Sequence, residues 1–383
     1  MTLHIFNPEH DIALASHLAN FTAPHAGRQL RADLGFLPAL WAKDGDVVWV
    51  EHEESAQKAY DRLSKRVVCA LQTPCLQGGN IMFASSKCHT FNIPITRIEP
   101  WGWDLALRAA LRRKGIADSL LPSDEYLELV RQLSHRRTAA QLLPKLRQEG
   151  TVGESFECSE AREVEELLQR YGQVVMKAPW SSSGRGLRFL SSDRTPFASQ
   201  AGWFRNVVAS QGSVMVEPFY HKVKDFGMEF EATDDGIRYL GLSLFDTANG
   251  AYTGNVLATE QTKREMMGRY VPLSLLDDVR DAVISMLDLR AYRGPFGIDM
   301  MVVNAPSSTS QASGSESQGL GSTSQGSGSE SQASGLLHPC VEINLRRTMG
   351  HVALAISPQK DDIVKVMRII CSKKQGERKI SLQ

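Results

Sequence analysis

The chain has 383 residues, and its 43 Lys and Arg residues balance its 43 Asp and Glu residues, so the formal net charge is zero. Apolar residues make up 42% and charged residues 22% of the chain, which is typical of a globular protein with roughly two or three domains. A zero net charge argues against the basic field of a nucleic-acid-binding protein, and no apolar run approaches the ~20 residues of a membrane-spanning helix. We therefore expect neither a nucleic acid nor a membrane as a partner.

Cysteine usage and the first residues indicate the cellular compartment. The six cysteines are spread along the sequence without a C-x-x-C pair, which fits the reducing cytosol better than a disulfide framework. Residues 1–8 lack the basic segment and the following apolar segment of a secretory signal peptide. The sequence predicts a cytoplasmic protein of enzyme size.

The N-terminal part, residues 1–130, alternates short apolar runs with helical patterns. Residues 3–6 and 47–50 predict buried strands, and the helical spacing of apolar residues over 103–111 predicts a helix. This alternation predicts an α/β domain with a mostly parallel sheet. The loop at 7–11 (NPEHD) places polar groups at the end of the first strand, where open α/β sheets bind ligands. It lacks the G-x-G-x-x-G pattern of a dinucleotide site.

A second unit, residues 131–212, combines a helix with a hairpin. Apolar spacing predicts a helix over 161–171 and a strand over 173–178, followed by the loop 180–186 (WSSSGRG). Lys177, at the end of this strand, supplies a cation, and the small loop residues let backbone N–H groups approach a phosphate. Taken alone, such a loop is more often an ordinary turn, and it does not match the Walker pattern.

The third unit, residues 213–383, carries the clearest candidates for metal binding. Around 341–346, apolar and polar residues alternate, so that Glu342, Asn344 and Arg346 share one face of an extended strand. Asp299 is a lone carboxylate within an apolar strand, and burying such a group without a cation is costly. Two carboxylates and an amide on neighbouring strands predict a Mg²⁺ site that is shared with substrate phosphates. The alternative is a buried salt bridge of Arg346 with Asp299 or Glu342.

One segment of low complexity interrupts this unit. Residues 308–321 and 322–335 are two copies of a 14-residue unit rich in Ser, Gly and Gln. Such a composition predicts a disordered loop, here bounded at 305–337, and a loop tip tolerates expansion because closure entropy grows slowly with length. Asp299 and Glu342 are 43 positions apart, and the duplication accounts for 28 of them. Without the duplication, Asp299 and Glu342 would be separated by a distance in sequence that is typical of two strands joined in a hairpin.

The order of these motifs resembles that of the ATP-grasp superfamily, which includes biotin carboxylase, carbamoyl phosphate synthetase and D-alanine–D-alanine ligase. The resemblance covers about residues 131–371. It rests on a basic residue (Arg136 or Arg137), Lys177 with its Gly-rich loop, Glu217 and Asp225, Asp299, and the E-x-N-x-R sequence at 342–346. It implies an α/β (α+β) ATP-grasp fold in which an N-terminal α/β domain (1–130) precedes two α+β lobes (131–212 and 213–383) that clasp ATP.

The resemblance also implies roles for individual residues. Met215 and Phe219 would flank adenine, Glu217 would contact its amino group, and Asp225 would contact the ribose. The full set of implied ATP-binding residues is Arg137, Lys177, Ser181, Ser182, Ser183, Gly184, Gly186, Met215, Glu217, Phe219 and Asp225. Asp299, Glu342 and Asn344 would hold one or two Mg²⁺ ions, with Mn²⁺ as an alternative. Arg346 and Lys177 would be the catalytic cations. Arg137 replaces a lysine that is usual in the family, and this leaves its phosphate contact open.

Family chemistry implies an ATP- and Mg²⁺-dependent, ADP-forming ligase. The γ-phosphoryl group passes to a substrate carboxylate, and an amine or similar nucleophile then displaces phosphate from the acyl phosphate. The substrates would be a small-molecule or peptide carboxylate and an amine, contacted by loop residues such as His10, Asp11, His25 and Arg28. A homodimer is an open alternative. Two other functions compete: an ATP-grasp kinase or synthase with a non-carboxylate acceptor, and a catalytically degenerate ATP-binding protein.

Overall fold

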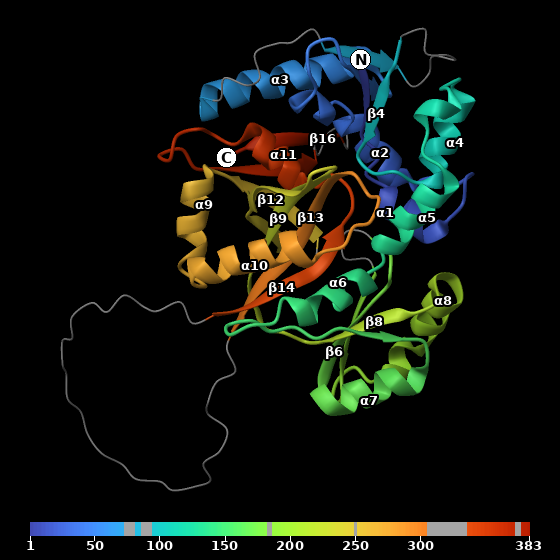
Figure 1. The fold of residues 1–383 in the computed structure, drawn as a ribbon, viewed down its shortest axis with the longest axis vertical. Helices are drawn as coiled ribbons and strands as arrows, with labels where there is room; N and C mark the ends of the chain where they lie inside the picture. The colour runs from blue at the N-terminus through green and yellow to red at the C-terminus, as the bar shows by residue number, and fades with distance from the viewer. Residues whose placement is uncertain (73–80, 86–93, 182–185, 249–250, 305–334, 372–376) are drawn as a thin grey trace, which may run out of the picture.

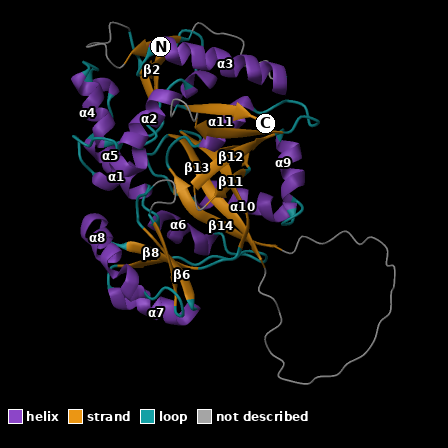
Figure 2. Cartoon of the chain, turned by 180° about the vertical axis from the view of Figure 1, so that it is seen from behind, coloured by secondary structure: helices purple, strands orange, loops and turns teal. Residues whose placement is uncertain are grey.

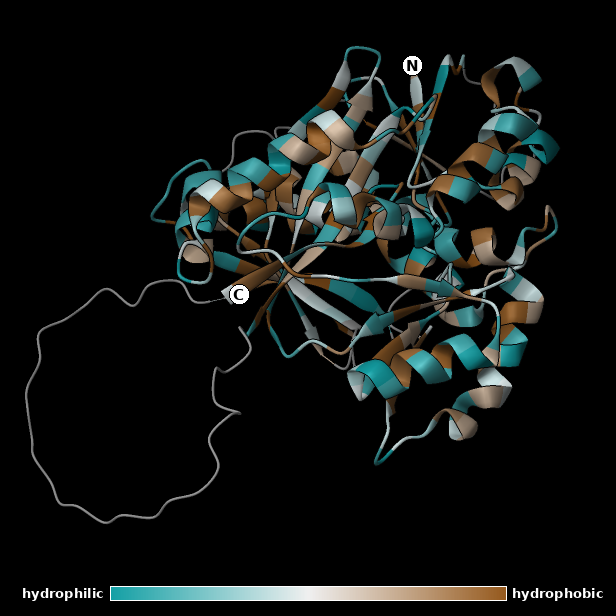
Figure 3. Ribbon diagram, turned by 60° about the horizontal axis from the view of Figure 1, so that its bottom comes forward, coloured by the Kyte–Doolittle hydropathy of each residue, from teal (hydrophilic) through white to brown (hydrophobic). Residues whose placement is uncertain are grey.

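A computed structural model of the chain describes residues 1–72, 81–85, 94–181, 186–248, 251–304, 335–371 and 377–383. Within these residues, the strands form four sheets of four strands each (Figure 1). No helix among them is long and apolar enough to cross a bilayer. Figure 3 shows that helices on the surface carry hydrophobic and hydrophilic stripes, as expected where one face packs against a core.

The N-terminal sheet is parallel, as the sequence predicts, with the strand order β3-β2-β1-β4. Its strands are β1 (Thr2–Ile5), β2 (Val47–Val50), β3 (Met82–Ser85) and β4 (Arg97–Pro100). The helices of this region are α1 (His10–Ser16), α2 (His25–Leu34), α3 (Glu53–Leu71), α4 (Leu105–Arg113) and α5 (Asp124–Leu133). Leu3 and Val47 pack with α4 residues, whereas Val48 and Val50 pack with α3 residues, so helices cover both faces of the sheet.

The next sheet is antiparallel and has the order β5-β8-β6-β7. It consists of β5 (Phe156–Cys158), β6 (Gln173–Lys177), β7 (Leu187–Ser191) and β8 (Val214–Pro218), with helices α7 (Ala161–Tyr171) and α8 (Ala201–Gln211). Met176 and Val216 belong to the core between the sheet and these helices. Because side chains alternate along a strand, Lys177 and Glu217 lie on the opposite face. We call this unit lobe 1.

The largest core surrounds the antiparallel sheet β10-β9-β13-β14. Its strands are β9 (Lys222–Thr233), β10 (Gly236–Ser243), β13 (Gly294–Asn304) and β14 (Gly335–Asn344), and the helices beside it are α6 (Arg137–Leu142), α9 (Glu260–Met267), α10 (Leu273–Met286) and α11 (Met349–Ile356). We call this unit lobe 2. Figures 1 and 2 show lobe 1 and the N-terminal sheet at opposite ends of the molecule with lobe 2 between them.

The fourth sheet joins the C-terminus to the N-terminal domain. It has the order β11-β12-β15-β16, with β11 (Phe245–Ala248), β12 (Ala251–Leu257), β15 (Lys365–Cys371) and β16 (Arg378–Leu382). Met367 and Ile380 share a hydrophobic core with Tyr60 and Leu63 of α3. The sequence analysis did not predict β15 and β16.

The predicted α/β class, with one parallel sheet followed by two lobes on antiparallel sheets, is confirmed. Two predicted boundaries need correction. The division at 212/213 is one strand too early, because β8 pairs with β5 and β6 and so belongs to the sheet of lobe 1. The loop predicted to end at 337 ends earlier, because Gly335 to Leu337 pair with the end of β13. Residues 305–334 lie outside the described residues.

Candidate active site

The two predicted metal carboxylates face each other on neighbouring strands. Asp299 of β13 is the cross-strand partner of Glu342 of β14, so their side chains lie on the same face of the sheet. The Asn344 side-chain NH₂ donates a hydrogen bond to Asp299 Oδ2 at 3.2 Å. Burial, together with the nearby carboxylates of Glu342 and Glu229, raises the pKa of Asp299 to about 8. Arg346 and the Asn344 amide favour the ionised form of Asp299, but they only partly offset these effects.

The alternative salt bridges of Arg346 are not formed. Arg346 pairs with Asp11, and Glu342 pairs with Arg136 at 2.9 Å. Asp299 takes part in no ion pair within the part of the chain that the structure describes. A half-buried carboxylate that faces a second carboxylate and forms no ion pair of its own fits a divalent metal ion.

The amide of Asn344 fits this site less directly. Its NH₂ group faces Asp299, while its oxygen accepts a hydrogen bond from Arg346 at 2.9 Å. Rotation of the amide would bring the oxygen to the Asp299 side. Among the described residues, no three His, Cys, Asp or Glu side chains are grouped to hold a metal, so a third protein ligand would have to be an amide such as this one. The role of Asn344 as a metal ligand stays a prediction.

Arg136, rather than Arg137, lies beside these carboxylates. Arg136 is 8% exposed, and its guanidinium donates to the backbone oxygen of Ala178 at 3.0 Å and to Ser181 Oγ at 3.3 Å, besides pairing with Glu342. It therefore connects the hairpin of lobe 1 to the metal carboxylates of lobe 2. Arg137 instead pairs with Glu157 at 2.8 Å at the surface. The structure does not place Arg137 near Glu342, and we assign the basic position to Arg136.

Lys177 lies at the end of β6 on the face of lobe 1 that carries no helices. Its ammonium group donates to Glu217 Oε2, and Ser155 Oγ donates to Glu217 Oε1 at 3.4 Å. Lys177 and Glu217 are 7% and 4% exposed, respectively, so both charges are buried and compensate each other. This contact differs from the predicted contact of Glu217 with an adenine amino group, because Glu217 already accepts from Lys177.

The Ser/Gly-rich loop is described only at its two ends. The Ala178 N–H donates to the Gly186 carbonyl at 2.8 Å, which closes the hairpin between β6 and β7. A Cβ on Gly186 would lie 2.4 Å from Ser181 Oγ, so the two ends approach too closely for any residue with a side chain at 186. The predicted phosphate contacts of Ser182, Ser183 and Gly184 lie outside the described residues.

The predicted nucleoside contacts lie near lobe 1 and β9. Met215 is fully buried opposite Lys177 in the β6–β8 pair, on the same face as Lys177 and Glu217. Phe219 follows β8, is 37% exposed and packs edge-on against Phe189. Asp225 lies on β9, where it accepts a hydrogen bond from Thr247 at 2.6 Å. Their roles toward a nucleoside stay predictions.

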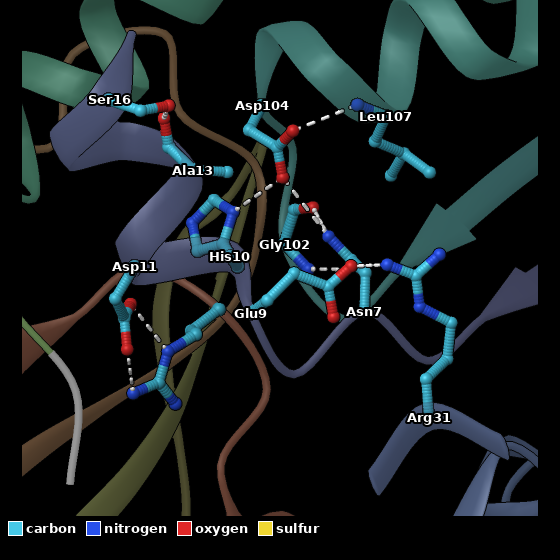
Figure 4. Close-up of polar contacts among 11 residues, drawn as sticks. Asn7, Glu9, His10, Asp11, Ala13, Ser16, Arg31, Gly102, Asp104 and Leu107 are labelled. Carbon is cyan, nitrogen blue, oxygen red and sulfur yellow. Dashed lines mark hydrogen bonds and ion pairs between the residues drawn. The ribbon is translucent and has the colours of Figure 1, made fainter. Parts of the chain in front are cut away.

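Arg346 connects lobe 2 to the N-terminal domain. Its guanidinium makes two hydrogen bonds to the Asp11 carboxylate, at 2.9 and 2.8 Å. Burial alone would raise the pKa of Asp11. The Arg346 guanidinium outweighs this effect and holds the pKa of Asp11 below its usual value. The loop after β1, which Figure 4 shows in detail, therefore borders the candidate active site.

Sequence reasoning did not single out Arg136 from its neighbour, but a signal for it existed. The buried residues Ala139 and Leu143 lie three and seven positions after Arg136. Helical periodicity puts Arg136 on that buried face and Arg137 beside it. Glu229 had no comparable signal, because it lies in a strand with acidic residues at alternate positions and only the tertiary structure places it near Asp299.

Comparisons with known proteins show a likeness at the level of the fold. No protein-family model and no curated protein matches the chain. Among solved structures, it is similar to the biotin carboxylase of Campylobacter jejuni in complex with a β-γ-ATP (12% identity, 98% of this chain and 77% of that chain, TM-score 0.49). It is also similar to the biotin carboxylase domain of Hydrogenobacter thermophilus 2-oxoglutarate carboxylase in complex with MgADP (14%, 99% and 76%, 0.48).

A third similar structure is the N5-carboxyaminoimidazole synthetase of Staphylococcus aureus in complex with ADP (12% identity, 96% of this chain and 82% of that chain, TM-score 0.45). The TM-scores describe loose superpositions. The function proposed below therefore rests on the strands and side chains of this chain.

Proposed function

We propose that this protein is an ATP- and Mg²⁺-dependent ligase that activates a substrate carboxylate as an acyl phosphate for attack by an amine. The observation that carries the proposal is the half-buried Asp299–Glu342 pair on β13 and β14, with Arg136 linking it to the hairpin that follows Lys177. A strand pair with two carboxylates facing a cationic, glycine-containing hairpin suits a nucleotide whose phosphates share a metal ion with the protein.

In phosphoryl transfer, each of these side chains would have a separate role. Lys177 and Arg136 would bind phosphate oxygens, and the hairpin backbone from Ser181 to Gly186 would close over them. Asp299 and Glu342 would hold Mg²⁺, which would supply positive charge that stabilises the phosphate oxygens. Arg346 would orient the acceptor carboxylate, because Asp11 holds its guanidinium at the edge of the site.

The pairing of Lys177 with Glu217 has a consequence for nucleotide binding. A buried lysine that is already neutralised contributes to phosphate binding only if it shares its three N–H donors between the carboxylate and the phosphate. Glu217 then orients the ammonium group. The proposal thus assigns Glu217 to Lys177 instead of to the adenine.

The first test is calorimetric measurement of ATP binding with and without Mg²⁺. We expect Mg²⁺ to strengthen ATP binding to the wild-type protein, Lys177→Met to weaken it, and Asp299→Asn to remove the effect of Mg²⁺. Lys263→Met is a matched control for the lysine variant, because Lys263 is also buried and lies 3.4 Å from Glu260, but belongs to α9.

The outcomes separate the candidate functions. Absence of ATP binding to folded wild-type protein would contradict both a ligase and a kinase. If ATP binds, phosphate release that depends on both a carboxylate and an amine supports the ligase. ATP consumption that yields a stable phosphorylated product without an amine supports the kinase or synthase alternative.

A further inference from the structure

Helix α1, which follows β1, begins with a buried histidine that the proposed phosphoryl transfer does not use. His10 is 1% exposed, and its Nδ1 lies 3.3 Å from Asp104 Oδ2 (Figure 4). Asp104 is held in place from two sides. Its Oδ1 accepts from the backbone N–H of Leu107 at the start of α4 (2.8 Å), and its Oδ2 accepts from the Asn7 side chain (3.2 Å).

These contacts determine which of the two ring nitrogens of a neutral imidazole carries the hydrogen. An ionised carboxylate only accepts hydrogen bonds, so the hydrogen of neutral His10 resides on Nδ1 and points to Asp104. Nε2 then carries a lone pair. It is buried and has no hydrogen-bond partner among the described residues. A Cβ on Gly102 would lie 2.7 Å from the ring, so Gly102 allows the ring to pack directly against the backbone.

This histidine lies next to the candidate active site. Asp11, the following residue, forms the two-hydrogen-bond pair with Arg346 of lobe 2. Figure 4 shows the His10 ring between Asp104 on one side and Asp11 on the other. An unpaired acceptor is thus buried beside the residue that orients the cation proposed to bind the acceptor carboxylate.

We propose that His10 Nε2 is the base that accepts a proton from the amine nucleophile, an inference that rests on the proposed ligase function. The amine nitrogen attacks the carbonyl carbon of the acyl phosphate and forms the C–N bond. The C–O bond to the phosphate breaks, and inorganic phosphate leaves with the electron pair of that bond. An amine that arrives as a cation loses two protons in all. His10 Nε2 takes the first before the attack, which frees the lone pair of the nitrogen, and Asp104 stabilises the imidazolium ion; the departing phosphate takes the second.

The chemistry of Nε2 also restricts the nucleophile. An unprotonated ring nitrogen accepts a hydrogen bond, so the ligand must present a donor to it, and the Asp104 carboxylate on the other side of the ring favours a group that arrives as a cation. Ammonia or a primary amine meets both conditions. A thiolate or a carboxylate meets neither.

Burial of the ring suits a step that must exclude water. Helix α8 of lobe 1 contacts α1, and Arg131 of α5 donates a hydrogen bond to the Leu14 carbonyl of α1 at 3.0 Å. The contact between α8 and α1 places lobe 1 against the helix that begins with His10. An acyl phosphate held beside this helix would be shielded from water by the packed α8, which limits hydrolysis.

The test compares two nucleophiles. Wild-type protein is incubated with MgATP, the standard amino acids as carboxylates, and either ammonia or hydroxylamine. Hydroxylamine is largely unprotonated at neutral pH and needs no base, whereas ammonia arrives as ammonium. For His10→Gln, we expect the ratio of amide to hydroxamate formation to fall at least about 100-fold, in line with the usual effect of a general base.

His4→Gln is the matched control. His4 is also buried, also lies in the N-terminal sheet and is also paired with an aspartate, Asp46, at 3.1 Å, but it has no contact with Asp11 or Arg346. We expect the product ratio of this variant to equal that of the wild type. A second variant, Asp104→Asn, keeps a capping side chain for α4 but places an NH₂ group against Nδ1, which moves the imidazole hydrogen to Nε2. Its product ratio should also fall, and it decides the question if His10→Gln does not fold.

Each outcome has a distinct meaning. An unchanged ratio in folded His10→Gln or Asp104→Asn, including an equal loss of both products, overturns the assignment of His10 as the base. If the wild-type protein forms neither amide nor hydroxamate, the ligase proposal itself fails, and the assignment falls with it. That result appears before any variant is made, so the two failures are distinguishable.

Discussion

At the residue scale, Asp299 and Glu342 are two carboxylates that face each other across neighbouring strands, an arrangement that lowers the stability of the folded protein. The raised pKa of Asp299 reflects its burial next to other carboxylates. The protein keeps a group whose charge costs stability unless a cation binds. Such a cost is typical of a binding site and unusual for a purely structural strand.

The first prediction concerns Asp299→Asn. Because the pKa of Asp299 is raised from 3.8 to about 8, the wild type must take up a proton on folding at neutral pH, which costs stability. Asparagine avoids this cost, so the metal-free variant should have a higher melting temperature than the wild type at neutral pH. Mg²⁺ with ATP should raise the melting temperature of the wild type, because a ligand that binds the folded state stabilises it, and this Mg²⁺-dependent rise should vanish in the variant. An equal Mg²⁺-dependent rise in both proteins would contradict the metal assignment.

The second prediction concerns the pH dependence of stability through His338 of β14. Its ring is fully buried against Tyr220, and burial lowers its pKa from 6.5 to about 4. Between these values, the unfolded chain binds a proton that the folded protein does not bind. The free energy of unfolding should therefore fall as the pH drops from 6.5 to about 4, by about 3 kcal/mol in total.

His338→Leu should lack this part of the pH dependence. Denaturant unfolding of both proteins at a series of pH values measures it, because all other titrating groups are shared. Parallel stability curves for the wild type and the variant would contradict the buried, neutral state of His338.

Some residues of the candidate site could be predicted from the sequence, and others could not. Lys177, Asp299, Glu342 and Arg346 were found because each interrupts an apolar pattern or follows a strand, and both features are visible locally. Their partners could not be predicted in the same way. The Arg346–Asp11 pair, for example, joins residues that are 335 positions apart, and no local pattern contains that information.

At the element scale, helix α11 approaches β9 closely because its first turn contains Gly350. A Cβ at this position would lie 1.8 Å from Glu229 Oε1 and 2.5 Å from Ser243 Oγ. The third prediction is that Gly350→Ala lowers the free energy of unfolding by about 2 kcal/mol or more, because it overpacks a buried polar cluster.

Gly202→Ala in α8 is the matched control for this helix glycine. A Cβ there meets nothing within 4 Å, so alanine should raise the stability by about 0.5 kcal/mol through its higher helix propensity. Thermal and denaturant unfolding measure both variants. Equal effects of the two substitutions would show that α11 is not held by close packing at Gly350.

Some helices and strands were predicted correctly from the sequence, and others were not. The helix α7, with its strong apolar stripe, was predicted at its observed bounds, whereas only the second half of β14 was predicted, from its alternating pattern. The strands β15 and β16 were not predicted, because both are only partly buried and carry charged residues at several positions, and β16 also lies at the edge of its sheet. The position of β8 in lobe 1 also escaped prediction, since strand order depends on tertiary pairing.

At the scale of the whole molecule, the duplicated segment lies between two strands whose ends already meet. Asn304 of β13 is the cross-strand partner of Gly335 of β14. The fourth prediction is that replacing residues 308–334 with a short turn leaves ATP affinity unchanged. Because a shorter loop costs less closure entropy, the free energy of unfolding should stay the same or rise by up to about 2 kcal/mol. Calorimetry and thermal unfolding of the shortened chain check both values, and a large loss of either would assign a structural role to the segment.

The proximity of Asn304 and Gly335 makes this position suitable for protein engineering. A folded guest domain with neighbouring termini, such as a circularly permuted fluorescent protein, needs two attachment points that lie side by side, and the strand ends provide them. Asp299 lies five residues before Asn304 on the same strand, about 17 Å away in an extended chain. A guest inserted here would sit at the far end of the strand that carries the proposed metal ligand, where its brightness could report nucleotide binding in living cells.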